Sequence, residues 1–488
     1  MNARLLVLVL LASIALFASQ AEALFGRRTR WGLVPPPEDK LQASASVVSG
    51  WFTQKLDHFN PQERRTFNQR YFLNADYFNQ TDPKAPVFLF LGGEGELRST
   101  WVTQGTMFDL GKKFGALLIA LEHRYYGDSH PFTDLSTPNL AWLSSQQALA
   151  DYAYFSQVFE NGAYSGRRWY AFGGSYSGGL AGWLRMKYPT FFHGSLASSG
   201  PVDPVIEYWQ YFDVVQNALQ YYGGADCVND FTTATNEVDS MVKTAPQDIA
   251  QKLNLCYAPN KFSTDMDLAG LWETMIDTFA GIVQYNKDGA PVSVRTVCQQ
   301  LKQAPRKSDA FLAIIKSQLT PGNCTEWDYR AQLAPIANQA ITTAGNMRQW
   351  IYQTCTEFGY YQTTSQKVKI IPSDKIPLSF FINLCKDAFG ITYDLDYIKK
   401  ATRDTVVNYG STDIPVSNVI WTNGNIDPWH VLSVLDKTPS QPDTMTLMMI
   451  EGTSHCASLY APGQYDTDSL KKAREQIADI FAGYLAQP

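Results

Sequence analysis

Four short, almost continuous apolar runs lie between residues 86 and 202, and each contains or ends in glycine or polar residues. Runs of this length are typical of parallel strands that are buried on both faces. Residues 145–160 form a helix-like stretch between two of the runs, and alternating segments at 47–59 and 66–78 predict an antiparallel hairpin before them. Strands that alternate with helices predict an α/β sheet. The four runs are PVFLFLGGEGE, GALLIALEHRYYG, RRWYAFGGSYS and HGSLASSGPV.

The pattern becomes helical from about residue 206 and returns to strands after about residue 390. Apolar residues recur at three- and four-residue intervals through this middle part, which has few strand-like runs. We therefore predict an α/β core formed by residues 46–205 and 391–488, interrupted by a helical insertion of residues 206–390. The helix-like stretches include VIEYWQYFDVVQNALQYY, MDLAGLWETMIDTFAGIVQY and NMRQWIYQTCTEFGYY, and the returning strands lie in VSNVIWTNGNIDPWH and TMTLMMIEGTSHC.

Residues 1–23 have the features of a secretory signal peptide. MNARLLVLVLLASIALFASQAEA contains an early arginine, an apolar run and small residues at Ala21 and Ala23, which predicts cleavage after Ala23. The run is shorter than the ~20 apolar residues of a membrane anchor, and we expect no later membrane span. The product should therefore be secreted or lysosomal. Its sequons at Asn79 and Asn323 are candidate N-glycosylation sites.

Composition and cysteine number narrow the class of protein. Hydrophobic residues make up 45% of the chain and charged residues 18%, which is typical of a globular protein. The formal net charge of −6 argues against a nucleic-acid partner, because such proteins usually carry a basic surplus. Seven cysteines in a secretory product favour disulfides, and the odd number leaves at least one unpaired. None shows CxxC spacing, so we expect no zinc site.

The stretch AFGGSYSGGLAGWLRMKYP, residues 171–189, places two serines in a glycine-rich turn between a strand-like run and a helix-like run. Strand, tight turn with serine and helix define a nucleophile elbow, in which the serine backbone is strained and small neighbours avoid clashes. Neither Ser175 nor Ser177 matches G-x-S-x-G fully, because each has serine at one flanking position. We favour Ser175 as the nucleophile because it directly follows the strand, and a purely structural turn is the alternative.

A catalytic serine needs a histidine that takes its proton and a carboxylate that orients the histidine. In α/β-hydrolases these groups follow the serine in the order acid, then histidine, each in a loop after a strand. Asp427 and His455 occupy two such loops, and we predict them to be the acid and the base. Asp413 and Asp436 are rival acids, and Asp427 could instead cap the turn that follows it.

An oxyanion hole needs backbone N–H groups that point toward the developing negative charge. The residue after the nucleophile, here Tyr176, supplies one of them, and a loop after an early strand supplies another. The run FLFLGGEGEL offers that loop, with Gly93 and Glu94 nearest to its turn. We take Gly93 as the candidate, and a simple tight turn is the alternative.

Seven motifs along the mature chain resemble the prolyl-specific serine peptidases, the family of lysosomal Pro-X carboxypeptidase and dipeptidyl peptidase II. The resemblance implies an α/β-hydrolase fold with a helical cap inserted in its core, and no metal or organic cofactor. It also implies that Ser175, Asp427 and His455 form the triad of an exopeptidase that cleaves after proline. Two motifs, DPWHVLSV and GTSHC, are most similar to the thymus-specific branch. The motifs are LDHFNP, LGGEGEL, EHRYYGDSHPF, FGGSYSGGLAGWLRMKYP, QTCTEFGYY, NGNIDPWHVLSV and GTSHC.

The resemblance further implies disulfides in the helical insertion. The implied bridges are Cys227–Cys298, Cys256–Cys324 and Cys355–Cys385. The remaining cysteine, Cys456, lies in the core beside the predicted base. We therefore predict that Cys456 is the free thiol.

The insertion is expected to act as a lid that restricts the site to the ends of short peptides. Its aromatic residues Trp209, Tyr211, Trp272 and Trp350 could line a pocket for proline, although ordinary helix packing explains any one of them equally well. A lipase or esterase of the same fold and a catalytically inactive binding module are the alternative functions. The sequence leaves open carboxypeptidase versus dipeptidyl peptidase action and the oligomeric state, a homodimer included.

Overall fold

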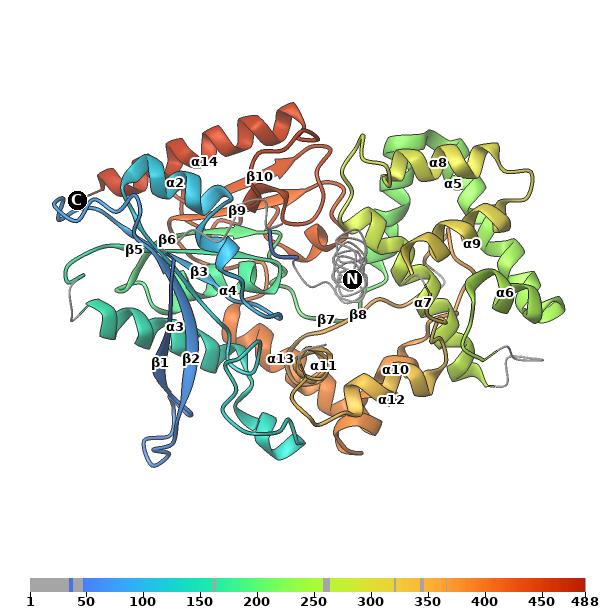
Figure 1. The fold of residues 1–488 in the computed structure, drawn as a ribbon, viewed down its shortest axis with the longest axis horizontal. Helices are drawn as coiled ribbons and strands as arrows, with labels where there is room; N and C mark the ends of the chain where they lie inside the picture. Colours follow the sequence, from blue (N-terminus) through green and yellow to red (C-terminus); the bar gives the residue numbers. More distant parts are fainter. Residues whose placement is uncertain are drawn as a thin grey trace, which may run out of the picture.

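One mixed sheet of eight strands forms the centre of the molecule (Figure 1). The strands lie in the order β1-β2-β4-β3-β5-β6-β9-β10. Strand β2 runs antiparallel to its neighbours β1 and β4, and all other pairs are parallel. This is the strand arrangement of the α/β-hydrolase fold, so that prediction is confirmed. The bounds are β1 Val48–Lys55, β2 Thr66–Asn74, β3 Val87–Leu91, β4 Leu117–Leu121, β5 Trp169–Gly174, β6 Phe192–Ser198, β9 Val419–Gly424 and β10 Thr446–Ile450.

The computed structural model does not describe every residue, and the expected signal segment, residues 1–23, lies outside the described part. Within that part, no helix combines the length and the hydropathy that a bilayer span requires. The described residues are 35–37, 47–160, 164–257, 264–319, 322–342, 346–365 and 367–487.

Strands β3 and β4 are apolar at every position, as suits strands that helices cover on both faces of the sheet. In β3, Phe88 and Phe90 belong to one buried cluster, whereas Val87, Leu89 and Leu91 belong to the other. This alternation follows from the two-residue period of a strand. Helices α2 and α14 contribute to the first cluster, and α3 and α4 contribute to the second. The bounds are α2 Thr106–Phe114, α3 Ser145–Glu160, α4 Tyr176–Lys187 and α14 Asp468–Ala486.

The chain between β6 and β9 is mostly helical, and Figure 1 shows α5 to α9 gathered beside the sheet rather than on its faces. Two short strands, β7 and β8, pair with each other in this part. The π-helical segment η4, Thr354–Phe358, directly precedes β8. The bounds are β7 Val205–Glu207, α5 Gln210–Thr244, α6 Pro246–Leu253, α7 Asp265–Gln284, α8 Val294–Gln303, α9 Lys307–Gln318, α10 Tyr329–Ala337, α11 Met347–Gln353, β8 Gly359–Tyr361, α12 Leu378–Phe389 and α13 Leu395–Tyr409.

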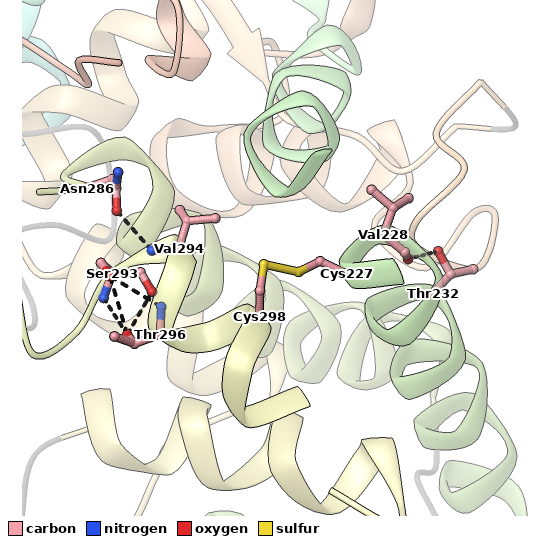
Figure 2. The surroundings of a disulfide bond; sticks show 8 residues. All are labelled: Cys227, Val228, Thr232, Asn286, Ser293, Val294, Thr296 and Cys298. Carbon is pink, nitrogen blue, oxygen red and sulfur yellow. Dashed lines mark hydrogen bonds between the residues drawn. A yellow bond between two sulfur atoms is a disulfide. The ribbon is translucent and has the colours of Figure 1, made fainter. Parts of the chain in front are cut away.

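Three disulfides lie among these helices, and their pairs are the ones that the family resemblance implies. The bridges are Cys227–Cys298, Cys256–Cys324 and Cys355–Cys385. The first joins α5 to α8, as Figure 2 shows, and its partners are 71 residues apart in sequence. A crosslink that closes a loop of this length lowers the entropy of the unfolded chain and contributes about 4 kcal/mol in the chain-entropy model.

The start of α8 is fixed beside this bridge by a capping box (Figure 2). Ser293 Oγ accepts a hydrogen bond from the Thr296 amide, and Thr296 Oγ1 accepts one from the Ser293 amide. Asn286 Oδ1 accepts a further hydrogen bond from the Val294 amide at 2.9 Å. These contacts satisfy amide groups that a helix N-terminus leaves unpaired. They therefore hold Cys298 in place for its partner on α5.

The sequons lie on the surface. Asn79 and Asn323 are both exposed, so each side chain is accessible to the enzyme that would glycosylate it. Glycosylation at these positions stays a prediction.

Cys456 is buried and unpaired. After denaturation without a reducing agent, alkylation should therefore modify one thiol per chain, and peptide mapping should place it at Cys456. Alkylation of the native protein should be slow because the side chain is buried. A bridge to Cys456 in the non-reducing peptide map would contradict this pairing scheme.

Candidate active site

Ser175 lies in the tight turn between β5 and α4 and has a strained backbone. Its φ is 57° and its ψ is −131°, a region that side chains other than glycine rarely adopt. Such a conformation costs about 1–3 kcal/mol and persists only where the surroundings determine it. The Ser175 amide donates to the Ser198 carbonyl at 2.9 Å, and the Ser175 carbonyl accepts from the Gly178 amide at 2.8 Å. This geometry is that of a nucleophile elbow.

The glycines around the turn are needed because the chain packs against itself there. A Cβ atom on Gly173 would lie 2.0 Å from the Ser177 carbonyl oxygen. A Cβ on Gly178 would lie 2.6 Å from the Ser198 carbonyl oxygen. The small residues of the motif thus allow the sharp strand-to-helix turn that carries Ser175.

Ser177 has a different role from Ser175. Its Oγ accepts a hydrogen bond from the Gly174 amide at 3.0 Å and donates to the Gly174 carbonyl at 2.9 Å. The side chain is buried within the first turn of α4. Ser177 therefore fastens the start of the helix to the end of the strand.

Asp427 and His455 lie side by side after β9 and β10. His455 Nδ1 is 2.9 Å from both carboxylate oxygens of Asp427, and both side chains are fully buried. Asp427 Oδ1 also accepts the Trp429 amide at 3.0 Å, which fixes the carboxylate at the start of its short 3-10 helix. The rival acids are elsewhere: Asp413 is hydrogen bonded to side chains after β9, and Asp436 is exposed.

The carboxylate controls the charge on the histidine. Burial alone would lower the pKa of His455, but the negative charge of Asp427 outweighs it and raises this pKa well above the ordinary value. The other ring nitrogen, Nε2, is buried and has no hydrogen-bond partner among the residues that the structure describes. An imidazole held in this way can accept a proton at Nε2 while its charged form is stabilised at Nδ1.

The histidine loop packs directly on the serine turn. A Cβ atom on Gly174 would lie 3.0 Å from Cys456 Sγ, the side chain next to His455. The Cys456 amide donates to Ser199 Oγ at 2.9 Å, just after β6. The carboxyl ends of the parallel strands β5 and β10 therefore lie at one edge of the sheet, where the loops after them bring Ser175 and His455 together.

The loop after β3 also meets the turn. A Cβ on Gly93 would lie 3.3 Å from Ser177 Cβ, and Tyr176 is the first residue of α4. The Gly92 carbonyl accepts a hydrogen bond from the Tyr152 hydroxyl of α3 at 2.7 Å, which fixes the start of the loop. The two predicted oxyanion-hole residues thus lie on segments that touch.

A small pocket lies among the inserted helices and reaches Trp429, two residues after Asp427. Its lining includes Tyr211, Gln284, Trp350, Tyr360 and Trp429. Aromatic side chains therefore form much of its wall, and they come from α5, α11, β8 and the 3-10 helix after Asp427. Of the aromatic residues proposed from the sequence, Tyr211 and Trp350 line this pocket.

The other two proposed residues have packing roles. Trp272 is fully buried inside the helical part, and Trp209 packs beneath the Lys367 ammonium group. The sequence interpretation missed Tyr360 and Trp429. The position of Trp429 two residues after the predicted acid was the available indication of its role.

Gln284, at the end of α7, connects the pocket to the Asp427–His455 pair. Its side-chain oxygen accepts hydrogen bonds from Tyr211 Oη at 2.8 Å and from Trp429 Nε1 at 3.1 Å. Its backbone carbonyl accepts the His455 amide at 2.9 Å. A helix from the inserted part thus holds both the pocket wall and the histidine loop. Nothing in the sequence pattern of α7 indicated this connection.

The described residues contain no cluster of histidine, cysteine, aspartate or glutamate side chains that could hold a metal ion.

Comparison with known proteins covers nearly the whole chain. The model of the serine carboxypeptidase S28 family matches residues 54–477. The thymus-specific serine protease of Mus musculus is 34% identical over 456 residues, which are 89% of this chain and 87% of that protein. A putative serine protease of Caenorhabditis elegans is 32% identical over 464 residues, which are 90% of this chain and 88% of that protein. The lysosomal Pro-X carboxypeptidase of Homo sapiens is 28% identical over 502 residues, covering 97% and 96%.

A buried polar network lies behind the serine turn. The Tyr176 hydroxyl accepts a hydrogen bond from Gln353 Nε2 at 3.0 Å and lies 3.1 Å from His123 Nε2. Gln353 in turn contacts Glu357, whose carboxylate accepts the amide and the hydroxyl of Ser145. Burial raises the pKa of Glu357 to about 7, although these hydrogen bonds oppose the shift.

The raised pKa of Glu357 predicts a pH dependence of stability. The folded protein binds this proton more tightly than the unfolded chain, so the fold loses stability as pH rises from about 4.5 to about 7. Glu357→Gln should remove this loss, which amounts to about 3 kcal/mol for a shift of this size. Urea unfolding of both proteins at pH 5 and pH 7 measures the difference.

The matched control is Glu475→Gln, at an exposed position of α14. It should keep the pH dependence of the wild type. If the Glu357→Gln protein loses stability with rising pH as steeply as the wild type, the pH dependence does not come from Glu357.

Proposed function

Because the chain belongs to the serine carboxypeptidase S28 family, we propose that it hydrolyses short peptides beside proline, with Ser175, His455 and Asp427 as its catalytic residues. The chain is a serine peptidase by family. The observation that carries the finer proposal is the Asp427–His455 pair at 2.9 Å, on loops that pack against the strained Ser175 turn.

The triad acts in two steps. Ser175 Oγ attacks the peptide carbonyl carbon while His455 Nε2 takes its proton, and the Asp427 carboxylate stabilises the imidazolium. The N–H groups of Tyr176 and Gly93 stabilise the oxyanion. His455 then gives its proton to the leaving amine, and water hydrolyses the acyl-enzyme by the reverse sequence.

The inserted helices supply the selectivity. We assign residues 206–390 as a cap on a core made of residues 46–205 and 391–488. The cap narrows access to the triad, so a short peptide enters and a folded protein does not. The aromatic pocket that contains Trp350 and Trp429 offers flat apolar surfaces suited to a proline ring.

The site suits a protein of the secretory pathway. Three disulfides require an oxidising compartment to form. The alignment with the human lysosomal Pro-X carboxypeptidase covers 96% of that protein. We propose a secreted or lysosomal enzyme that acts on peptides.

Digestion of a library of unstructured peptides tests the function. We expect cleavage next to proline and near the peptide ends, while folded proteins stay intact. Mass spectrometry identifies the products, and Ser175→Ala is the inactive control. Hydrolysis of simple esters without any peptide cleavage would favour a lipase or esterase, and cuts within peptides blocked at both ends would contradict the exopeptidase proposal.

The two serines of the turn should respond differently to substitution. Ser175→Ala should lower kcat/KM by at least ~10³-fold because it removes the nucleophile. Ser177→Ala should keep most of the activity and lose about 1 kcal/mol of stability, because Ser177 makes only structural hydrogen bonds with Gly174. Steady-state kinetics and urea unfolding measure both effects. Equal losses of activity in the two variants would overturn the assignment.

A further inference from the structure

The loop that leads to His455 is held on one side by the segment that follows β9. The Gly452 amide donates to Asn425 Oδ1 at 2.7 Å. The Thr453 carbonyl accepts a hydrogen bond from the Ile426 amide at 3.0 Å. These contacts fix the loop to the α/β core, and further contacts come from the inserted helices.

The inserted helices also contact this loop. Tyr285, just after α7, places its ring edge-on to the His455 ring, with 6.1 Å between the ring centroids. Hydrogen bonds from α5 and from the end of α7 reach the polar groups around it. The bonds join Tyr222 Oη to the Gly452 carbonyl at 3.2 Å, Ser454 Oγ to the Asn286 carbonyl at 2.8 Å and the His455 amide to the Gln284 carbonyl at 2.9 Å. The residues on the helix side, which we call the histidine clamp, are Tyr222, Gln284, Tyr285 and Asn286.

Helix α8 supports the clamp through Asn286 and Tyr222. The Val294 amide, at the start of α8, donates to Asn286 Oδ1 at 2.9 Å (Figure 2). The Arg295 guanidinium lies 5.4 Å from the centre of the Tyr222 ring, a cation–π distance. A residue of α5 and a residue just after α7 therefore share α8 as a support.

The Cys227–Cys298 bridge joins α5 to α8 (Figure 2). It packs on the residue next to Tyr222, since a Cβ atom on Gly223 would lie 2.5 Å from Cys298 Sγ. Helix α5 is kinked at Gly224, where φ is 66° and ψ is −170°. The regular helix is interrupted between Tyr222 and Cys227, so the crosslink to α8 restrains the position of Tyr222 where the helix does not.

We propose that the Cys227–Cys298 bridge positions His455 through the histidine clamp, so that a disulfide of the inserted helices controls the rate of the reaction at Ser175. This inference rests on the proposed role of His455 as the base of the serine peptidase. A base acts only within hydrogen-bond reach of the proton that it takes, and a displacement of about 1 Å can lower a rate roughly 100-fold. Tyr222 and the two cysteines are positioning residues, because in the described part of the chain they do not line the pocket.

The Cys256–Cys324 bridge provides a matched control. Its partners are 68 residues apart, against 71 for Cys227–Cys298, so the two crosslinks lower the entropy of the unfolded chain about equally. Cys256 follows α6, which lies at the end of the helical part far from the sheet (Figure 1). Its amide donates to the Thr325 carbonyl at 2.9 Å, a contact within the inserted part. Loss of this bridge should therefore lower the stability without moving the histidine clamp.

Two double variants test the proposal: Cys227→Ser/Cys298→Ser and Cys256→Ser/Cys324→Ser. The reaction rate with a fluorophosphonate reports on Ser175 and His455 without a peptide, and kcat and KM are measured on one proline-containing peptide. All rates are measured well below the Tm of each variant, so that the fold is intact. The first variant should lose about 10- to 100-fold in fluorophosphonate rate and in kcat, with KM little changed. The second should keep the wild-type rates and lose a similar amount of stability.

Single substitutions test the clamp with all disulfides in place. Tyr222→Phe and Ser454→Ala each remove one hydroxyl from the contacts between the loop and the clamp. Each should lower the fluorophosphonate rate and kcat about 3- to 10-fold, the scale of one hydrogen bond. Tyr221→Phe is the matched control, because this exposed neighbour bonds to the Glu451 side chain and should keep the wild-type rates.

Equal losses of rate in the two double variants would show that the first bridge acts only through stability. A loss confined to KM, or wild-type rates in Cys227→Ser/Cys298→Ser, would remove the positioning role. If that variant does not fold, wild-type rates in both Tyr222→Phe and Ser454→Ala would overturn the proposal instead. In each case the wild type still reacts at Ser175, so the proposed function stands. A wild type that does not react with the fluorophosphonate would remove the proposed function, and this inference with it.

Discussion

The backbone of Ser175 is held in a left-handed conformation by hydrogen bonds to both of its peptide groups, between the last residue of β5 and the first residue of α4. An isolated turn of this kind would relax, because the conformation costs free energy. The sheet keeps it in place through the Ser198 carbonyl, and glycines at 173 and 178 allow the close contacts. The rest of the site is arranged around this fixed point.

The histidine is positioned jointly by the core and by the inserted helices. Asp427 orients its ring from the core, and Gln284 binds its backbone from α7. Gln284 also holds Trp429 and Tyr211, so the pocket wall and His455, the proposed base, share one support. A displacement of α7 would therefore change both the pocket wall and the position of His455.

The parts of the site that could be predicted from the sequence are those encoded locally. Ser175, Asp427 and His455 stand in loops directly after apolar runs, where strand order alone brings them together. Gln284 could not be predicted because its role depends on how α7 packs against distant loops. Helical periodicity likewise cannot distinguish Trp272, which is fully buried, from Trp350, which lines the pocket. Both have the spacing of a buried helix face.

The most direct test of the account is the reaction of the native protein with a fluorophosphonate, followed by peptide mapping at a series of pH values. The account predicts a single modified residue, Ser175, and a rate that rises with pH as His455 loses its proton, through a raised pKa. Asp427→Asn should remove the charge that raises this pKa, so the rise should move to lower pH and the overall rate should fall. Modification of Ser177, or a rate independent of pH and of Asp427, would contradict the account.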